Sequence, residues 1–188
     1  HHAYADRASG FCFLNNAAIA AEILRQRFGR VAVLDFDTHH GDGTQALFYR
    51  RDDVFFGSSH TDPANYYPYF AGYADERGAG AGEGHTLNSP LAPGSGDEEL
   101  IAANRTLVVA ALAAGAEAIV ISAGWDAHHD DPLSRLKVTT DAYRALGDLY
   151  GEIPLPTVIV QEGGYSLAAI AEAAPQFVEA FLNERKVG

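Results

Sequence analysis

The sequence predicts an open α/β sheet with mainly parallel strands. Short β-branched runs alternate with helical stretches along the 188 residues, and this alternation indicates parallel strands joined by crossover helices. The run RVAVLDFD (30–37) is almost continuously apolar, which suits a strand covered on both faces of such a sheet. Hydrophobic residues make up 47% of the chain and charged residues 20%, so we expect residues 1–188 to form a single domain with a substantial core.

The individual elements follow from local patterns. Residues 15–28 carry apolar side chains at near-helical spacing, with Asn15 or Asn16 as the N-cap and Gly29 as the stop. A strand at 30–37 follows directly. The later expected elements are strands at 54–59, 118–124 and 157–163, and helices from about Asp97 to Ala114, Thr140 to Tyr150 and Ala168 to Leu182.

Two stretches lack a clear period. The segment from Ser59 to Pro93 is rich in Gly, Pro and Tyr, and we expect a long loop there, because loops of this length in compact domains are usually functional. The last residues, ERKVG, are expected to fray.

Composition limits the class of protein. No run approaches the roughly 20 apolar residues that span a bilayer, and no signal-peptide pattern is present, so we expect a cytoplasmic protein without membrane contact. The single Cys12 agrees with a reducing compartment. A net charge of −12 argues against nucleic acid and suits cationic substrates or partners. Since the chain contains no Met, we expect it to be part of a longer protein.

Carboxylates and imidazoles follow three of the predicted strands. The strings are DFDTHHGDG (35–43), WDAHH (125–129) and EGGY (162–165). Ligands of open α/β sheets lie beyond the carboxyl ends of the strands, so these side chains are expected to converge at one edge.

A metal site is the chemistry that these residue types favour. Asp37 and His39 lie two apart, and Asp126 can complete a set of two oxygens and one nitrogen with open positions, which suits a catalytic Zn²⁺. Alternatively, each buried acid caps a helix or pairs with an Arg. A two-metal site of the arginase type is disfavoured, because Gly41 and His128 stand where further carboxylates are needed.

Four separated motifs now give a specific resemblance. The strings DFDTHHGDGTQALFY, SAGWDAHHDDPL and EGGYSL, and the opening HHA followed by GFCFLNNAAIAA, resemble the signatures of the histone deacetylase and acetylpolyamine amidohydrolase superfamily. The resemblance runs from His1 to the last helix and implies the three-layer α/β/α arginase/deacetylase fold, with an N-terminal portion of the catalytic domain missing before His1. It also makes His1 and His2 part of a family motif, although adjacent terminal histidines more often come from a purification tag.

The resemblance implies a zinc-dependent deacetylase with one Zn²⁺ held by Asp37, His39 and Asp126. It assigns His2 as general base and acid, with Asp42 as its hydrogen-bond partner. A carboxylate partner raises the basicity of an imidazole and fixes its tautomer.

Further roles come from the same resemblance. His1, paired with Asp35, stays charged and supports the site electrostatically. Tyr165 donates its hydroxyl to the oxyanion of the tetrahedral intermediate. An isolated Tyr would more often be a core aromatic, but Tyr165 follows two glycines at a strand end.

Substrate and cation contacts are also implied. The expected substrate-binding residues are Gly10, Phe11, Tyr67, Leu133, Gly163 and Gly164. Phe11 and Tyr67 would form opposite walls of an acyl-lysine tunnel, unless both are ordinary core residues. The expected ligands of structural K⁺, largely through backbone carbonyls, are Asp35, Asp37, His39, Phe48, Ser58 and Ser59. His128 and His129 receive no role and are expected near the site or on the surface.

The substrate is predicted from the segment 59–91. Its order of DPA, YP, GYA and GAG resembles polyamine deacetylases of bacteria, so a small cationic acetylpolyamine is expected ahead of an acetyl-lysine protein. Leu133 argues the other way, because it is apolar where a polyamine-selecting acid could stand. A non-catalytic binder and a dimanganese ureohydrolase are the remaining alternatives, and a homo-oligomer is possible.

Overall fold

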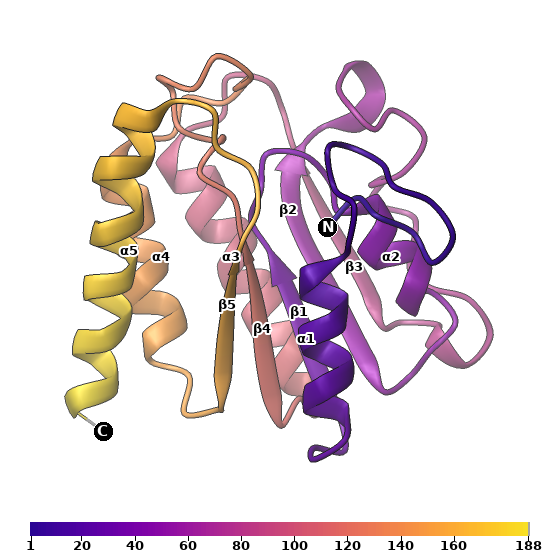
Figure 1. The fold of residues 1–188 in the computed structure, drawn as a ribbon. Coiled ribbons are helices and arrows are strands. Elements are labelled where there is room, and N and C mark those ends of the chain that lie inside the picture. Colours follow the sequence, from indigo (N-terminus) through magenta and orange to yellow (C-terminus); the bar gives the residue numbers. More distant parts are fainter. Residues whose placement is uncertain (188) are drawn as a thin grey trace.

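A five-stranded parallel sheet forms the centre of the computed structural model, which describes residues 1–187 (Figure 1). Its strands are β1 (Val31–Asp35), β2 (Val54–Thr61), β3 (Thr86–Leu91), β4 (Ala118–Ala123) and β5 (Thr157–Gln161). They lie in the order β3-β2-β1-β4-β5, and every neighbouring pair is parallel. The predicted parallel α/β class is therefore confirmed.

Helices cover both faces of the sheet. The helices α1 (Asn16–Arg25) and α2 (Asp42–Phe48) lie on one face, and α3 (Asp97–Ala113), α4 (Thr140–Gly151) and α5 (Leu167–Val187) lie on the other (Figure 1). The central strand β1 shows why two cores form. Val31 and Val33 pack with the small residues of α1, whereas Ala32 and Leu34 join the larger core under α3, α4 and α5. This arrangement is the predicted three-layer α/β/α fold.

Asn15, one of the two predicted caps, is the N-cap of α1, but the helix is shorter than the predicted 15–28. The side-chain oxygen of Asn15 accepts a hydrogen bond from the Ala18 amide at 2.9 Å, which satisfies one of the free N–H groups of the first turn. The helix ends at Arg25, four residues before Gly29. Ile23 is 61% exposed, so the buried face of α1 consists of small alanines and not of its large apolar residues.

Two elements were not predicted. Helix α2 lies within the motif DFDTHHGDGTQALFY, and β3 lies within the segment from Ser59 to Pro93, so the prediction of one continuous loop there was wrong. That segment also contains the end of β2 and two short 3₁₀ turns, at Pro63–Asn65 and Gly80–Gly82.

The bounds of the last two elements also differ from the prediction. Strand β5 stops at Gln161, before the predicted 163. Helix α5 runs through Glu184 and Arg185, so these residues are helical instead of frayed, and Gly188 lies outside the described residues.

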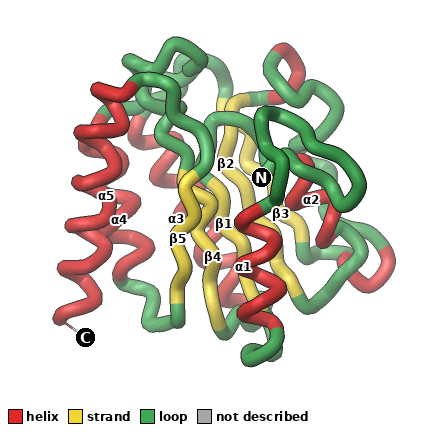
Figure 2. The backbone as a smooth tube through the Cα atoms, viewed as in Figure 1, coloured by secondary structure: helices red, strands yellow, loops and turns green. Residues whose placement is uncertain are grey.

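The loops that follow the carboxyl ends of the strands gather at one end of the sheet, where the N-terminus also lies (Figure 2). The motifs after β1, β4 and β5 therefore meet the opening residues of the chain. In the described part of the chain, no helix is both long and apolar enough to cross a bilayer.

Candidate active site

Asp37, His39 and Asp126 come together at the carboxyl end of the sheet. Their potential ligand atoms lie within 4.8 Å of one another, and all three residues are buried. The His39 Nδ1 atom is 3.0 Å from Asp126 Oδ2 and 3.2 Å from Asp37 Oδ1. Backbone amides orient both carboxylates, since Thr38 N–H donates to Asp126 and Gly163 N–H donates to Asp37.

The electrostatics of this group fit a bound cation. Burial would lower the pKa of His39, but its hydrogen bonds to Asp126 and Asp37 raise that pKa to about 9. Burial, together with the charge of Asp37, raises the pKa of Asp126 to about 7. The raised pKa values mean that positive charge beside these buried carboxylates is favoured, and two carboxylates with one imidazole suit a divalent metal ion with open coordination positions.

Two buried His–Asp pairs lie beside Asp37, His39 and Asp126, the candidate metal group. The His1 Nδ1 atom lies 2.7 Å from Asp35, and the His2 Nδ1 atom lies 2.7 Å from Asp42. The two imidazole rings are 4.0 Å apart between centroids. The hydroxyl of Tyr4 donates to the second oxygen of Asp42 at 2.7 Å, so that carboxylate is held from two sides.

The two imidazoles differ in charge. Burial would lower the pKa of His1, but the negative charges of Asp35 and Asp37 raise it well above its usual value. Burial and the neighbouring positive charge of His1 lower the pKa of His2. At neutral pH His1 is therefore a cation, while His2 is neutral and able to accept a proton.

Tyr165 lies on the loop after β5 and lines the same pocket as His2 and His39. The amide of Gly163 donates to Asp37 at 2.7 Å, which brings the start of this loop against the candidate metal group. Burial, with the charges of Asp126 and Asp37, raises the pKa of Tyr165 above its usual value. Its hydroxyl therefore stays protonated and can act as a hydrogen-bond donor.

An aromatic cavity of about 620 Å³ opens beside these residues. Gly10, Phe11, Tyr67 and Leu133 line it, whereas Gly163 and Gly164 line an adjoining cavity of about 480 Å³ that also reaches Asp37 and His39. Phe11 is 87% exposed, so it is not a core residue. The ring of Tyr67 lies edge-on to that of His2, at 5.0 Å.

Sequence reasoning missed Tyr66, which lines this cavity, and Asp131, which does not line it but bonds to residues that do. Tyr66 stacks on the His39 ring at 4.8 Å with an interplanar angle of 14°, and its hydroxyl donates to the Leu133 carbonyl. Asp131 is buried and accepts hydrogen bonds from the amides of Tyr165 and Leu133. The DDPL string contained a signal for Asp131, because an acid before Pro often accepts bonds from the amides that follow it.

The residues expected to hold K⁺ lie at the end of β1, in the loop that follows it, within β2 and on α2. Asp35 is paired in register with Ser58, and the Ser59 hydroxyl donates to the Asp35 carbonyl at 3.5 Å. Phe48 closes α2. A structural K⁺ at these positions stays a prediction.

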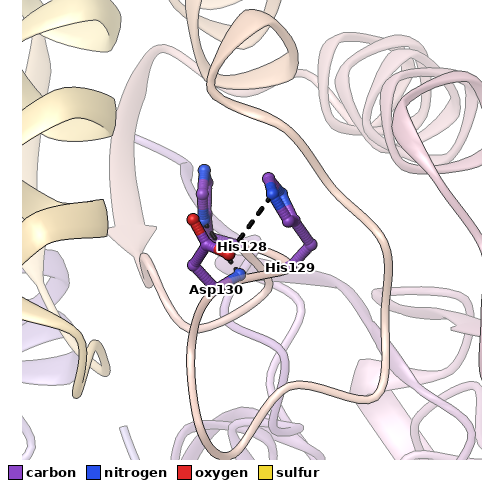
Figure 3. A group of neighbouring side chains, drawn as sticks. All are labelled: His128, His129 and Asp130. Atoms are coloured by element: carbon purple, nitrogen blue, oxygen red, sulfur yellow. Dashed lines mark hydrogen bonds and ion pairs between the residues drawn. The ribbon is translucent and has the colours of Figure 1, made fainter.

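A second cluster of possible ligands consists of His128, His129 and Asp130 (Figure 3). Both ring nitrogens of His128 are occupied, one by the Asp130 amide and one by Thr140, each at 3.2 Å. His129 donates to the Val138 carbonyl at 3.0 Å. Within this cluster, only His129 and Asp130 keep atoms that could bind a metal ion, and both residues are exposed. The contacts of the cluster therefore mainly hold the loop after β4 together.

The chain belongs to a known family. Residues 1–181 match the histone deacetylase domain, so the chain is a member of the histone deacetylase domain family. An acetylpolyamine amidohydrolase of Burkholderia pseudomallei is 49% identical over 181 residues, which are 96% of this chain and 53% of that protein. Acetylpolyamine amidohydrolase 1 of Pseudomonas aeruginosa is 48% identical over 182 residues, with the same two coverages.

Solved structures agree with this assignment. The crystal structure of acetylpolyamine aminohydrolase from Burkholderia pseudomallei matches with a TM-score of 0.93 and 48% identity, covering 96% of this chain and 53% of that one. A histone deacetylase homologue complexed with SAHA matches with a TM-score of 0.89 and 33% identity, covering 96% of this chain and 50% of that one. The chain thus spans about half the length of the relatives it matches.

Proposed function

We propose that the protein is a zinc-dependent amidohydrolase that removes acetyl groups from acetylated amines, with acetylpolyamines as its main substrates. One observation carries this proposal. Asp37, His39, the neutral imidazole of His2 and the hydroxyl-bearing Tyr165 line one cavity, and the buried Asp126 lies 3.0 Å from the His39 ring. Amide hydrolysis needs an activated carbonyl, a proton acceptor and an oxyanion donor, and these residues offer all three.

The relatives support the substrate class. The two proteins compared above and a further one, from Mycoplana ramosa at 44% identity, are acetylpolyamine amidohydrolases. A net charge of −12 favours approach of a cationic amine. The apolar and aromatic cavity walls at Phe11, Tyr67 and Leu133 suit the methylene chain next to the acetylated nitrogen.

His2 carries out the proton transfers. A Zn²⁺ held by Asp37, His39 and Asp126 would polarise the amide carbonyl and lower the pKa of water. His2 accepts the proton of the attacking water at Nε2, because its Nδ1 is bonded to Asp42. His1 keeps its charge beside Asp35 and stabilises the negative charge that develops next to it. His2 then returns the proton to the departing amine nitrogen.

Tyr165 donates its hydroxyl to the oxyanion of the tetrahedral intermediate. One such donor is worth about 3 to 4 kcal/mol, or about 10²- to 10³-fold in kcat. We therefore expect Tyr165→Phe to keep its bound metal and lose most of its turnover. Tyr49→Phe is the matched control, since Tyr49 lines neither cavity. Turnover of Tyr165→Phe near that of the wild type would contradict the role.

Acetate release tests the whole proposal. The intact, zinc-loaded protein is given an N-acetylated polyamine and an acetyl-lysine peptide at equal concentration, and a chelator is then added. We expect hydrolysis of the polyamine to exceed that of the peptide, to stop with the chelator and to return with Zn²⁺. A preference for the peptide would overturn the substrate class and leave the metal chemistry standing. No acetate from either substrate would overturn the activity itself.

A further inference from the structure

Asp131 lies in the loop after β4 and ties that loop to the one that carries Tyr165. Its side chain is buried, with 5% of the residue exposed. The Oδ2 atom accepts hydrogen bonds from the amides of Tyr165 at 2.6 Å and Ser166 at 3.0 Å. The Oδ1 atom accepts one from the Leu133 amide at 3.0 Å. A single carboxylate therefore satisfies three backbone donors from two loops.

The Tyr165 loop needs such an anchor. Gly163 and Gly164 precede Tyr165, and Gly164 has a φ of +148°, a conformation that few other residues adopt. Two glycines in succession make the backbone before Tyr165 flexible. The position of the tyrosine ring would therefore vary unless another contact fixed it. On the far side of Tyr165, Ser166 directly precedes α5, and its hydroxyl accepts from the Ala169 amide at 3.3 Å. The carboxylate of Asp131 thus fixes the point where flexible loop becomes helix.

The same side chain also shapes the opposite wall of the cavity. Its bond to the Leu133 amide sets the position of Leu133, whose carbonyl accepts the Tyr66 hydroxyl. Tyr66 in turn stacks on His39. Asp131 is consequently connected to both sides of the pocket, although it lines neither cavity itself.

We infer that Asp131 is a positioning residue that holds the Tyr165 hydroxyl at the reacting carbonyl. The inference rests on the proposed amidohydrolase activity. Charge-assisted hydrogen bonds to two consecutive amides are strong and directional, so they restrict the Tyr165 backbone more than a neutral acceptor would. In Asp131→Asn, an NH2 group replaces one of the two acceptor oxygens. Because an NH2 group only donates hydrogen bonds, it cannot accept one from a backbone N–H group.

A double-mutant cycle tests the inference. The kcat and KM for an acetylated polyamine are measured for the wild type, Asp131→Asn, Tyr165→Phe and the double variant. We expect Asp131→Asn to lower kcat by about tenfold or more, with KM changed by less than about threefold. In the Tyr165→Phe background we expect the same change to cost less than about twofold, because residues that act through one another are non-additive.

Metal content and thermal unfolding are measured for each variant, and Asp130→Asn is the matched control. Asp130 is the exposed neighbour of Asp131, so its variant should keep wild-type kcat and KM. If Asp131→Asn loses its cooperative unfolding transition, Asp131→Glu takes its place, since it keeps the charge and moves the oxygens by one methylene.

The outcomes separate this inference from the proposed function. Equal losses of kcat in both backgrounds would overturn the inference alone, because Asp131 would then act independently of Tyr165. Loss of the fold in both Asp131 variants would also overturn it, by making the residue structural. A wild-type protein that releases no acetate would overturn the proposed function and this inference with it.

Discussion

Gly163 lies where a side chain would collide with two carboxylates of the candidate metal group, Asp37 and Asp126. A Cβ atom built on it would be 2.2 Å from Asp126 Oδ2 and 2.6 Å from Asp37 Oδ2, both closer than Cβ atoms come in real structures. The glycine therefore allows the loop after β5 to approach the acids closely enough for its amide to donate to Asp37. At the scale of single residues, the absence of a side chain is as important here as the charged groups.

We expect Gly163→Ala to weaken metal binding by displacing both carboxylates. Disturbing a group that hydrogen-bonds to a metal ligand, as the Gly163 amide does to Asp37, typically costs about 10- to 100-fold in metal affinity. Competitive titration with a chromophoric chelator measures the dissociation constant directly. Gly96→Ala is the control, since the nearest atom to a Cβ there is 3.8 Å away. Unchanged zinc affinity in Gly163→Ala would show that the site relaxes around the methyl group.

At the scale of elements, Asn15 connects three parts of the chain. Its oxygen caps α1, while its Nδ2 group donates to the carbonyls of His1 and Ala3 and lies 3.0 Å from the Thr44 hydroxyl of α2. A buried amide with this many partners both begins a helix and holds the segment that carries the two leading histidines.

We expect Asn15→Ala to lower the free energy of unfolding by about 2 to 4 kcal/mol. The lost N-cap costs about 1 kcal/mol and the unpaired buried carbonyls account for the rest. Asn15→Asp keeps the capping oxygen but not the donors, so its loss should fall between those of wild type and Asn15→Ala. Chemical denaturation of the three proteins gives the order, and equal stability of Asn15→Asp and Asn15→Ala would contradict the capping role.

Elements with a clear local sequence pattern were predicted, and elements without one were missed. The strands around 30–37, 54–59 and 118–124 were predicted because apolar runs of that length are characteristic of buried parallel strands. Strand β3 was missed because its sequence, TLNSPL, contains Asn, Ser and Pro. It is an edge strand, where a proline without an N–H is tolerated. Helix α2 has only seven residues and little periodicity of its own.

At the scale of the whole molecule, the parallel sheet explains how residues far apart in sequence reach one pocket. Position at a strand end predicted that Asp37 and Asp126 would converge, since carboxyl ends share an edge. The positions of Phe11 and Tyr66 depended instead on loops whose paths no period in the sequence defines. The DDPL string indicates only the local bond of Asp131 to the Leu133 amide, and its bonds to the amides of Tyr165 and Ser166 depend on how two distant loops meet.

Buried histidines make the stability of the molecule depend on pH, and His60 in β2 is the clearest case. Its ring is fully buried, lies 2.8 Å from the Ser58 hydroxyl and donates to the Gly72 carbonyl at 2.8 Å. Burial lowers the pKa of His60 from 6.5 to about 4. Between these two values the unfolded chain binds a proton that the folded protein does not, so stability falls as the pH falls through this range.

The pH dependence of the stability lost in His60→Gln tests this role of the buried imidazole. The shift of the His60 pKa from 6.5 to about 4 corresponds to about 3 kcal/mol of stability that is present above pH 6.5 and lost near pH 4. The cost of His60→Gln in unfolding free energy should therefore shrink by about 3 kcal/mol between these pH values, as measured by denaturant titration. Leu100→Ala removes a fully buried apolar side chain, so its cost should stay constant with pH. A cost of His60→Gln that is equally constant would mean that the ring takes up its proton within the folded protein.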